Sequence, residues 1–158
     1  MYHPDDTDSR LLLALVTDPD STVVALANTL GLSRNTVQAR MTRLTQNSVF
    51  LPFDRRINPA ALGYLLTAFI LIHVQQQKLA WIVKELATIP EIVQGHGLSG
   101  RADLLVRVVC TDAEDLFRVN GAILACEGVE RAETSLAMGE VIPFRMEPLL
   151  RRGPRPAR

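Results

Sequence analysis

Apolar residues in the first third of the chain recur every three or four positions, which is the period of an α-helix. Three such stripes predict helices at residues 7–17, 23–30 and 33–46. Gly31 lies between the second and third stripes, where glycine can take a left-handed conformation and end a helix without steric cost. Ser33 is expected to cap the third helix, because its hydroxyl can accept a hydrogen bond from a backbone N–H of the first turn. Two short helices joined in this way form a helix-turn-helix.

From residue 65 onward, the pattern changes to strands that alternate with helices. The expected order is strand 65–74, helix 79–87, strand 92–98, strand 103–110, a helix opened by a capping box at 111–114 and ending near residue 126, and strand 130–138. This order is the split βαβ, ferredoxin-like arrangement, in which both helices cover one face of a four-stranded antiparallel sheet. The predicted fold class is therefore α+β: an N-terminal, winged-helix-like helix-turn-helix domain followed by a ferredoxin-like βαββαβ domain.

These patterns divide the chain into four parts. Residues 1–50 are expected to form the helix-turn-helix domain, and residues 65–150 the ferredoxin-like domain. Residues 51–64 contain two prolines and no helical period, which predicts a connector with an extended segment. Residues 151–158 contain four arginines and no acid. This basic tail is either a disordered, solvated end or a flexible contact to phosphate.

The first and third expected strands are apolar on both faces, at residues 67–72 and 104–109. In a ferredoxin-like sheet the helices cover only one face, so the strands should alternate between apolar and polar residues. Another cover is therefore needed for the second face, and the same sheet of a second chain is the simplest one. The pattern predicts an obligate homodimer.

The charge of the whole chain does not indicate its partner, because 17 basic residues balance 17 acidic ones. The distribution of charge along the chain is more informative. No acid occurs between Leu32 and Phe53, whereas three arginines do. Repulsion by phosphate would make an acid costly in a surface that binds nucleic acid. The third helix is therefore a candidate for contact with DNA.

The outward positions of this helix carry side chains that can contact base edges or phosphates. Arginine binds guanine or phosphate, asparagine and glutamine bind adenine, and threonine and alanine contact the thymine methyl group. The helix is expected to enter the major groove of double-stranded DNA. The alternatives are a helical hairpin used only for packing and a winged helix adapted to protein contacts. The candidate DNA-binding residues are Ser33, Arg34, Asn35, Thr36, Gln38, Ala39, Arg40, Thr42 and Arg43.

Other classes of protein find little support in the sequence. No apolar run is long enough to cross a bilayer, and the acidic N-terminus lacks a secretory signal, so a cytoplasmic protein is expected. Cys110 and Cys126 lie in apolar stretches without a CxxC motif, which favours buried, reduced thiols over a metal site. An enzyme site on this two-domain plan would need several histidines, and only His96 is suitably placed. No catalytic residues, metal or cofactor are expected.

Six short motifs, in a fixed order and spacing, extend over nearly the whole chain. They are Asp5-x-x-Asp8, Leu26-Ala27 ahead of Gly31-Leu32-Ser33, Thr36-Val37-x-x-Arg40-Met41-x-x-Leu44, Ile57-Asn58-Pro59 with Leu62-Gly63, Ser99-Gly100-x-x-Asp103-Leu104-Leu105, and Gly128-Val129. With these motifs the chain resembles the Lrp/AsnC family of bacterial and archaeal feast-famine regulators. That family usually has a glycine after the recognition helix, where this chain has Ser48.

The resemblance implies a DNA-binding domain joined to an effector-binding and oligomerisation domain, the RAM domain. It also implies dimers that assemble into larger rings, with small amino acids or related metabolites as effectors. The family's effector pocket lies around the turn between the second and third strands. Arg101 would then pair with the effector's carboxylate and Asp103 with its ammonium group. The residues that correspond to the pocket here are Ser99, Gly100, Arg101, Asp103, Thr134 and Ser135.

Several interpretations stay open at this point. The turn at residues 99–102 could be a plain hairpin whose charges face water. The protein could be a sequence-specific transcriptional regulator that responds to an amino acid. It could also be an architectural protein that binds DNA through its oligomer without any effector. A change in DNA binding caused by a ligand would distinguish these two functions.

Overall fold

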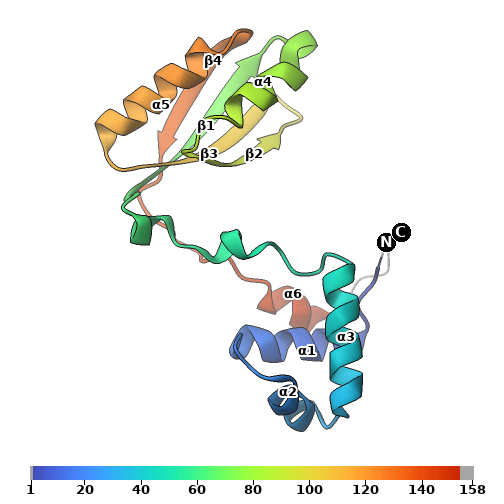
Figure 1. Cartoon of the computed structure of the whole chain (residues 1–158). Coiled ribbons are helices and arrows are strands. Elements are labelled where there is room, and N and C mark those ends of the chain that lie inside the picture. Colours follow the sequence, from blue (N-terminus) through green and yellow to red (C-terminus); the bar gives the residue numbers. More distant parts are fainter. Residues whose placement is uncertain (1, 154–158) are drawn as a thin grey trace. The chain divides into compact units, whose positions relative to one another are not determined.

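A computed structural model describes residues 2–153 of the chain, which form two compact units (Figure 1). The first unit contains the described residues up to Arg55 together with those from Ile142 onward, and the second extends from Arg56 to Val141. No helix in the described part of the chain has both the length and the apolar character needed to cross a membrane.

The first unit contains the three helices expected from the apolar stripes. They are α1 (Asp6–Thr17), α2 (Val23–Leu30) and α3 (Arg34–Gln46). Their apolar faces meet in a small core, and the unit contains no strand among its described residues. The fully or almost fully buried apolar members of this core are Leu11, Leu26, Ala27, Val37 and Leu44.

The turn between α2 and α3 has the predicted geometry. Gly31 has a φ of 67°, and its N–H donates hydrogen bonds to carbonyl oxygens in the last turn of α2. The Ser33 side chain accepts a hydrogen bond of 3.1 Å from the backbone N–H of Thr36, and so caps α3. Ser48, after α3, has a φ of 56°, a conformation that glycine adopts more readily. The glycine that the family resemblance implies for this position would adopt this φ without strain.

A short C-terminal helix completes the first unit. Helix α6 (Glu147–Arg152) packs against α1, so the chain after Ile142 belongs with the helix-turn-helix rather than with the sheet. This differs from the expected boundary at residue 150. Arg151 and Arg152 are helical, and Arg151 forms an ion pair of 2.7 Å with Glu147 one turn earlier. The rest of the expected basic tail, residues 154–158, lies outside the described residues.

The second unit is the expected ferredoxin-like fold. Its strand order is β2-β3-β1-β4 with antiparallel pairing throughout. The helices α4 and α5 lie on the same face of the sheet (Figure 1). The elements are β1 (Leu66–Val74), α4 (Leu79–Leu86), β2 (Ile92–Gly97), β3 (Leu104–Cys110), α5 (Ala113–Ala125) and β4 (Val129–Leu136).

Two local predictions in and before this unit need correction. Helix α5 is capped by Asp112, which accepts a hydrogen bond from the N–H of Asp115, and not by a box that starts at Thr111. The N–H of Thr111 instead donates to the Asp115 carboxylate. The connector at residues 51–64 is also less extended than expected, because it contains the 3₁₀ helices η1 (Phe53–Arg56) and η2 (Pro59–Leu62).

The two faces of the sheet differ in their cover. Alternate residues of β1, among them Ile70 and Ile72, are fully buried under α4 and α5. The residues between them face the other side, where no described element of this unit packs. On that side Phe69 keeps 41% of its surface exposed and pairs in register with Arg107 of β3. The second face is thus partly apolar and open to a partner.

Candidate nucleic-acid interface and effector turn

The outer surface of α3 displays a row of polar and small side chains. Val37 and Leu44 are fully buried and define the inward face of this helix. At about 100° per residue, Asn35, Ala39 and Thr42 project from the opposite face, and all three are exposed. Gln38 is exposed on one edge of this face. The side chains that could contact base edges therefore share one solvent-facing surface.

The start of α3 adds two features that suit phosphate. Ser33 and Thr36 form a hydroxyl–hydroxyl hydrogen bond of 2.8 Å that completes the cap. The free N–H groups of a helix's first turn and the positive end of its dipole attract anions. The Arg34 side chain is exposed and has no hydrogen bond or ion pair with another described residue. It is the available cation at this end of the helix.

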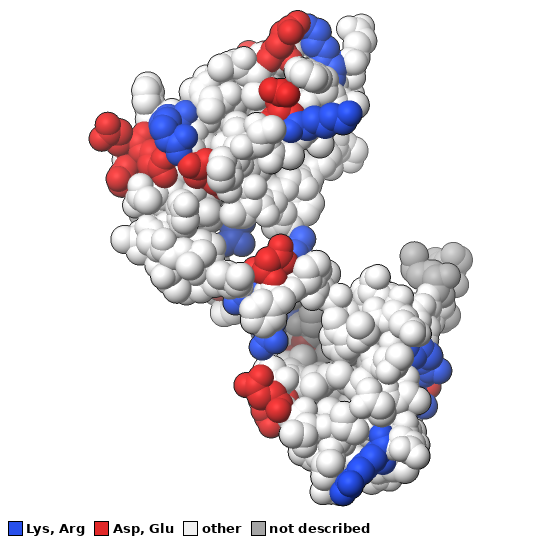
Figure 2. Space-filling view, viewed as in Figure 1, with Lys and Arg blue, Asp and Glu red and all other residues white. Residues whose placement is uncertain are grey.

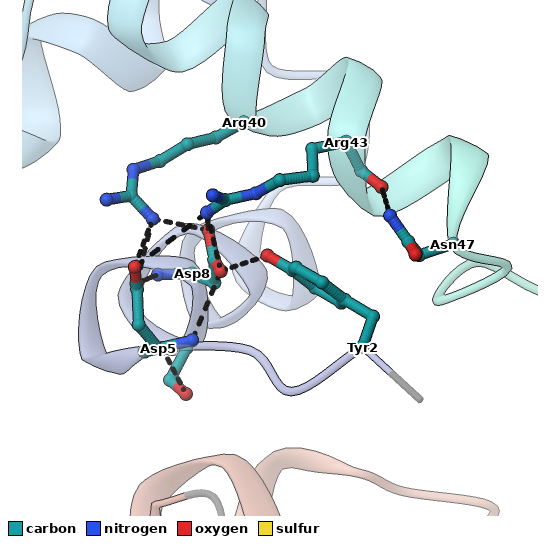
Figure 3. A network of polar contacts seen from close by, with 7 residues as sticks. Tyr2, Asp5, Asp8, Arg40, Arg43 and Asn47 are labelled. Carbon is teal, nitrogen blue, oxygen red and sulfur yellow. Dashed lines mark hydrogen bonds and ion pairs between the residues drawn. The ribbon is translucent and has the colours of Figure 1, made fainter.

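Arg40 and Arg43 have a different environment, because both extend toward the start of α1 (Figure 3). Nη1 of Arg40 donates to both carboxylate oxygens of Asp5 at 2.8 Å and to Oδ1 of Asp8 at 2.6 Å. Only 21% of the Arg40 side chain is exposed. The expected role of Arg40 as a direct DNA contact therefore competes with two carboxylates of its own chain.

Arg43 belongs to the same cluster but is more exposed. Its Nη2 lies 3.2 Å from Oδ2 of Asp8, and its guanidinium carbon is 5.2 Å from the centre of the Tyr2 ring. The Tyr2 hydroxyl also donates a hydrogen bond to Asp8. The Arg43 side chain is 46% exposed, so it lies at the edge of the cluster and borders solvent.

The carboxylates of this cluster are ionised at neutral pH. The hydrogen bonds from Arg40 lower the pKa of Asp5 below its ordinary value. Burial of Asp8 opposes ionisation, but hydrogen bonds from Tyr2 and Arg40 outweigh it and lower the pKa of Asp8. Burial, together with Asp8, raises the pKa of Tyr2. Two carboxylates and two guanidiniums thus make the cluster neutral overall.

Tyr2, Asp5 and Asp8 were not among the residues predicted for this surface. The signal available in the sequence was the Asp5-x-x-Asp8 spacing, which places two acids on one turn at the start of α1. Their capping box accounts for part of that spacing, since each side chain accepts from the other's backbone N–H. Their arginine partners lie more than 30 positions away, and only the packing of α3 on α1 brings them together.

The surface charge of the two units is mixed. On the face shown in Figure 2, basic and acidic residues form small groups separated by uncharged surface. This agrees with the balance of 17 basic and 17 acidic residues in the whole chain. On that face there is no broad basic field that would by itself hold DNA.

The expected effector turn is the exposed hairpin between β2 and β3. Ser99, Gly100 and Arg101 are exposed, and Arg101 makes no ion pair with any described residue. Asp103 is already occupied, because one oxygen accepts a 2.8 Å hydrogen bond from the N–H of Val74 and the other accepts from the Gln76 amide. Its carboxylate therefore fastens the start of β3 to the end of β1, where sequence reasoning expected it to be free for an ammonium group.

The two expected pocket residues on β4 do not join this turn within one chain. The Thr134 hydroxyl donates to the side chain of Asn120 on α5, so it lies on the helix-covered face. Ser135 is the next residue and points to the opposite face, in register with Phe69. Thr134 pairs with Ile70, which is about 13 Å along β1 from the strand end that contacts Asp103.

The geometry of the described residues supports neither a metal site nor a reactive cysteine. No cluster of three or more histidine, cysteine or acidic side chains within residues 2–153 could hold a metal ion. Cys110 is fully buried, and burial raises the pKa of its thiol to about 11. Burial likewise raises the pKa of Cys126. Both shifts favour the protonated thiol at neutral pH.

Comparison with known proteins gives matches to both units. Residues 5–45 match the AsnC-type helix-turn-helix domain, and residues 67–146 match the Lrp/AsnC ligand binding domain. The chain is 31% identical over 134 residues to the HTH-type transcriptional regulator FL11 of Pyrococcus furiosus, covering 85% of this chain and 89% of that protein. It is 34% identical over 115 residues to the HTH-type transcriptional regulator AldR of Mycolicibacterium smegmatis, covering 71% of this chain and 67% of that protein.

Solved structures agree with these matches. AsnC of E. coli superposes with a TM-score of 0.84 at 21% identity, covering 93% of this chain and all of that one, which supports the fold. A feast or famine regulatory protein from M. tuberculosis, complexed with L-methionine, superposes with a TM-score of 0.78 at 28% identity. That alignment covers 90% of this chain and 97% of the other.

Proposed function

Because the chain belongs to the Lrp/AsnC family of DNA-binding transcriptional regulators, we propose that it recognises a specific DNA sequence as a dimer and responds to a small amino acid. The observation that carries this proposal is the exposed face of α3. That face combines a capped N-terminus, the row of Asn35, Ala39 and Thr42, and Gln38 at its edge. Such a helix fits the major groove, whose base edges carry a distinct pattern for each base pair.

The residues of this surface would have two kinds of role. Asn35 and Gln38 would bind adenine, and the methyl groups of Ala39 and Thr42 would contact thymine. Arg34 and the capped first turn, with Ser33 and Thr36, would bind backbone phosphate and fix the register of the helix. The phosphate contacts first expected of Arg40 and Arg43 have less support, because both guanidiniums are paired with carboxylates.

The dimer would form through the second face of the sheet. Phe69, Leu71 and Leu105 lie on this face, and Phe69 remains substantially exposed in the single chain. Packing the same face of a second copy against it would remove this apolar surface from water. A symmetric dimer would also present two α3 helices to one duplex and favour a site with two similar half-sites. Assembly of dimers into larger rings, as the family resemblance implies, is part of the same proposal.

The amino-acid effector would bind at the hairpin after β2, with Ser99, Gly100, Arg101 and Asp103 in the site. Arg101 is exposed and unpaired in the described chain, so it is available for the effector's carboxylate. Thr134 and Ser135 lie too far along the sheet to complete this site from the same chain. They would have to be supplied by another copy. The related regulator complexed with L-methionine supports an amino acid as the ligand class.

Binding between copies would give the effector its influence on DNA. An effector changes an assembly only if it binds one arrangement of the copies more tightly than another. A changed spacing of the α3 helices would then alter affinity for a fixed pair of half-sites. Such a regulator would act on chromosomal DNA. A cytoplasmic location is therefore also part of the proposal.

One observation favours a second candidate, an architectural protein that binds DNA without an effector. Both oxygens of Asp103 already accept hydrogen bonds, one from the Val74 N–H and one from the Gln76 amide. The ammonium group of an amino acid would have to compete with these two donors for Asp103, which weakens binding of a zwitterion at this turn.

The experiment that separates the two functions is a DNA-binding titration of the full chain at fixed salt. The duplex comes from the region upstream of its own gene, and each titration is repeated with a panel of amino acids. A shift in affinity caused by one amino acid, and lost in Arg101→Gln, supports the regulator. Tight binding that no amino acid changes supports the architectural protein. An absence of binding to any duplex would contradict both.

A further inference from the structure

The three arginines of α3 differ in their electrostatic partners. Arg34 is exposed and has no carboxylate partner within the described chain, whereas Arg40 and Arg43 share Asp5 and Asp8. Four ion-pair contacts of 2.6–3.8 Å join the two acids to the two arginines. The recognition helix thus carries three formal positive charges, two of which are balanced inside the protein.

We propose that Asp5 and Asp8 act as internal substitutes for DNA phosphate and are specificity-determining residues of the DNA-binding surface. The proposal rests on the proposed function, since it concerns how that surface distinguishes its site from other DNA. The two carboxylates occupy the guanidiniums of Arg40 and Arg43 that would otherwise contact the backbone of any duplex. Sequence-independent affinity is thereby reduced, and base contacts contribute a larger share of binding.

The physical basis is the release of counterions from DNA. Each phosphate that a protein cation neutralises releases counterions and strengthens binding to every sequence alike. A guanidinium already paired with a carboxylate gains less from a phosphate, because it must exchange one anion for another. Base-edge contacts from Asn35 or Gln38 are not affected by this exchange, so the ratio of specific to non-specific binding rises.

The geometry indicates which of the two arginines could contact phosphate if it were not paired with a carboxylate. At about 100° per residue, Arg40 lies about 60° from the centre of the buried face, close to α1. Arg43 lies about 120° from that centre, at the border of the exposed face. Its side chain is 46% exposed, against 21% for Arg40. If the charge of Asp5 were lost, Asp8 alone would face both guanidiniums, at 2.6 Å from Arg40 and 3.2 Å from Arg43. One positive charge would then be unbalanced, and the more exposed Arg43 is the one placed to contact phosphate with it.

Asp5→Asn is the variant that tests this with the least damage to the fold. Asparagine caps a helix as well as aspartate does, so the hydrogen bond of 2.8 Å from the Asp8 N–H can remain. The matched control is Asp6→Asn, which removes the same charge from the neighbouring position. Asp6 is exposed and has no side-chain partner in the described chain. Circular dichroism of both variants checks that the helices remain intact.

The measurement is the slope of log affinity against log salt concentration on a random-sequence duplex. We expect Asp5→Asn to bind this duplex more tightly than wild type, with a slope steeper by about 0.9 per subunit for one new phosphate contact. Asp6→Asn should keep the wild-type slope. The double variant Asp5→Asn/Arg43→Gln should return to the wild-type slope, because the released arginine is then absent.

A second pair of variants does not depend on how well Asp5→Asn folds. Arg34→Gln should flatten the slope by about 0.9 per subunit, whereas Arg43→Gln should leave it nearly unchanged. Equal slopes for Asp5→Asn and Asp6→Asn, or equal flattening by Arg34→Gln and Arg43→Gln, would overturn the inference. Wild-type protein that binds no duplex would instead overturn the proposed function itself, so the two failures are distinguishable.

Discussion

Replacement of Asp8 by asparagine should destabilise the first unit and leave the second unit unchanged. The Asp8 side chain is fully buried and accepts hydrogen bonds from Tyr2, from the Asp5 backbone and from both Arg40 and Arg43. Asparagine has nearly the same shape as aspartate but no charge. Its NH₂ group would replace one carboxylate oxygen and face donor groups that the oxygen of Asp8 accepts from. The variant therefore leaves two guanidiniums without their shared anion.

The magnitude follows from the burial of each partner. Removing one member of a fully buried ion pair costs about 3–5 kcal/mol. Here the arginines keep 21% and 46% of their side-chain surface exposed, so water can take up part of their charge. We expect the free energy of unfolding of the first unit to fall by about 2–3 kcal/mol, below the fully buried case.

Two optical signals separate the units in a urea titration. Most helical residues lie in the first unit, so far-UV circular dichroism reports mainly on it. Trp81, the single tryptophan, lies in α4 and reports on the second unit. With an m-value of about 1 kcal/mol per M, the circular dichroism midpoint should fall by about 2 M. The tryptophan midpoint should not move.

The exposed neighbour Asp6 provides the control, because Asp6→Asn removes one acid from the same turn without breaking an ion pair. Equal circular dichroism midpoints for the two variants would refute the reasoning. An equal shift of the tryptophan signal in Asp8→Asn would also refute it, because the effect would then not be confined to the first unit.

Four further predictions concern pH and backbone conformation. Because the pKa of Asp8 is lowered from 3.8 in the folded state, its stabilising contribution is complete above that value and is lost as the pH falls through the lowered value. Acid titration should therefore unfold wild type more steeply than Asp8→Asn. Gly31→Ala should cost about 1 kcal/mol from its φ of 67° alone, since the added Cβ meets no atom within 4 Å. Gly128→Ala should cost more in thermal unfolding of the second unit, because its Cβ would lie 2.9 Å from Lys78 Cδ. Ser48→Gly should raise the stability of the first unit by about 1 kcal/mol, because it relieves a φ of 56°.

The parts of the fold that were predictable depend on short-range signals. The α2–α3 turn follows from Gly31 and Ser33, whose conformational and capping preferences act within a few residues. The order of strands and helices in the second unit follows from the change of apolar period near residue 65. Each expected strand was located to within two residues at either end. Such features need no knowledge of distant neighbours.

The remaining features depend on contacts between distant parts of the chain. Arg40 was expected on the DNA surface because nothing nearby in the sequence opposes its charge, whereas its carboxylate partners lie at the start of α1. Asp103 was expected to be free, but its donors are the N–H of Val74 at the end of β1 and the Gln76 side chain just after that strand. Helix α6 was missed because six residues are too few to reveal a helical period.

The most direct test of the central claim is selection of binding sites from random-sequence duplexes by the wild-type chain and by Gln38→Ala. If α3 reads base edges as proposed, wild type should enrich a motif with two similar half-sites. Gln38→Ala should enrich the same motif with one base pair relaxed in each half-site, a loss of about 1–3 kcal/mol of discrimination at that position. Enrichment of no motif, or of an identical motif by both proteins, would contradict the assignment of α3 as the recognition helix.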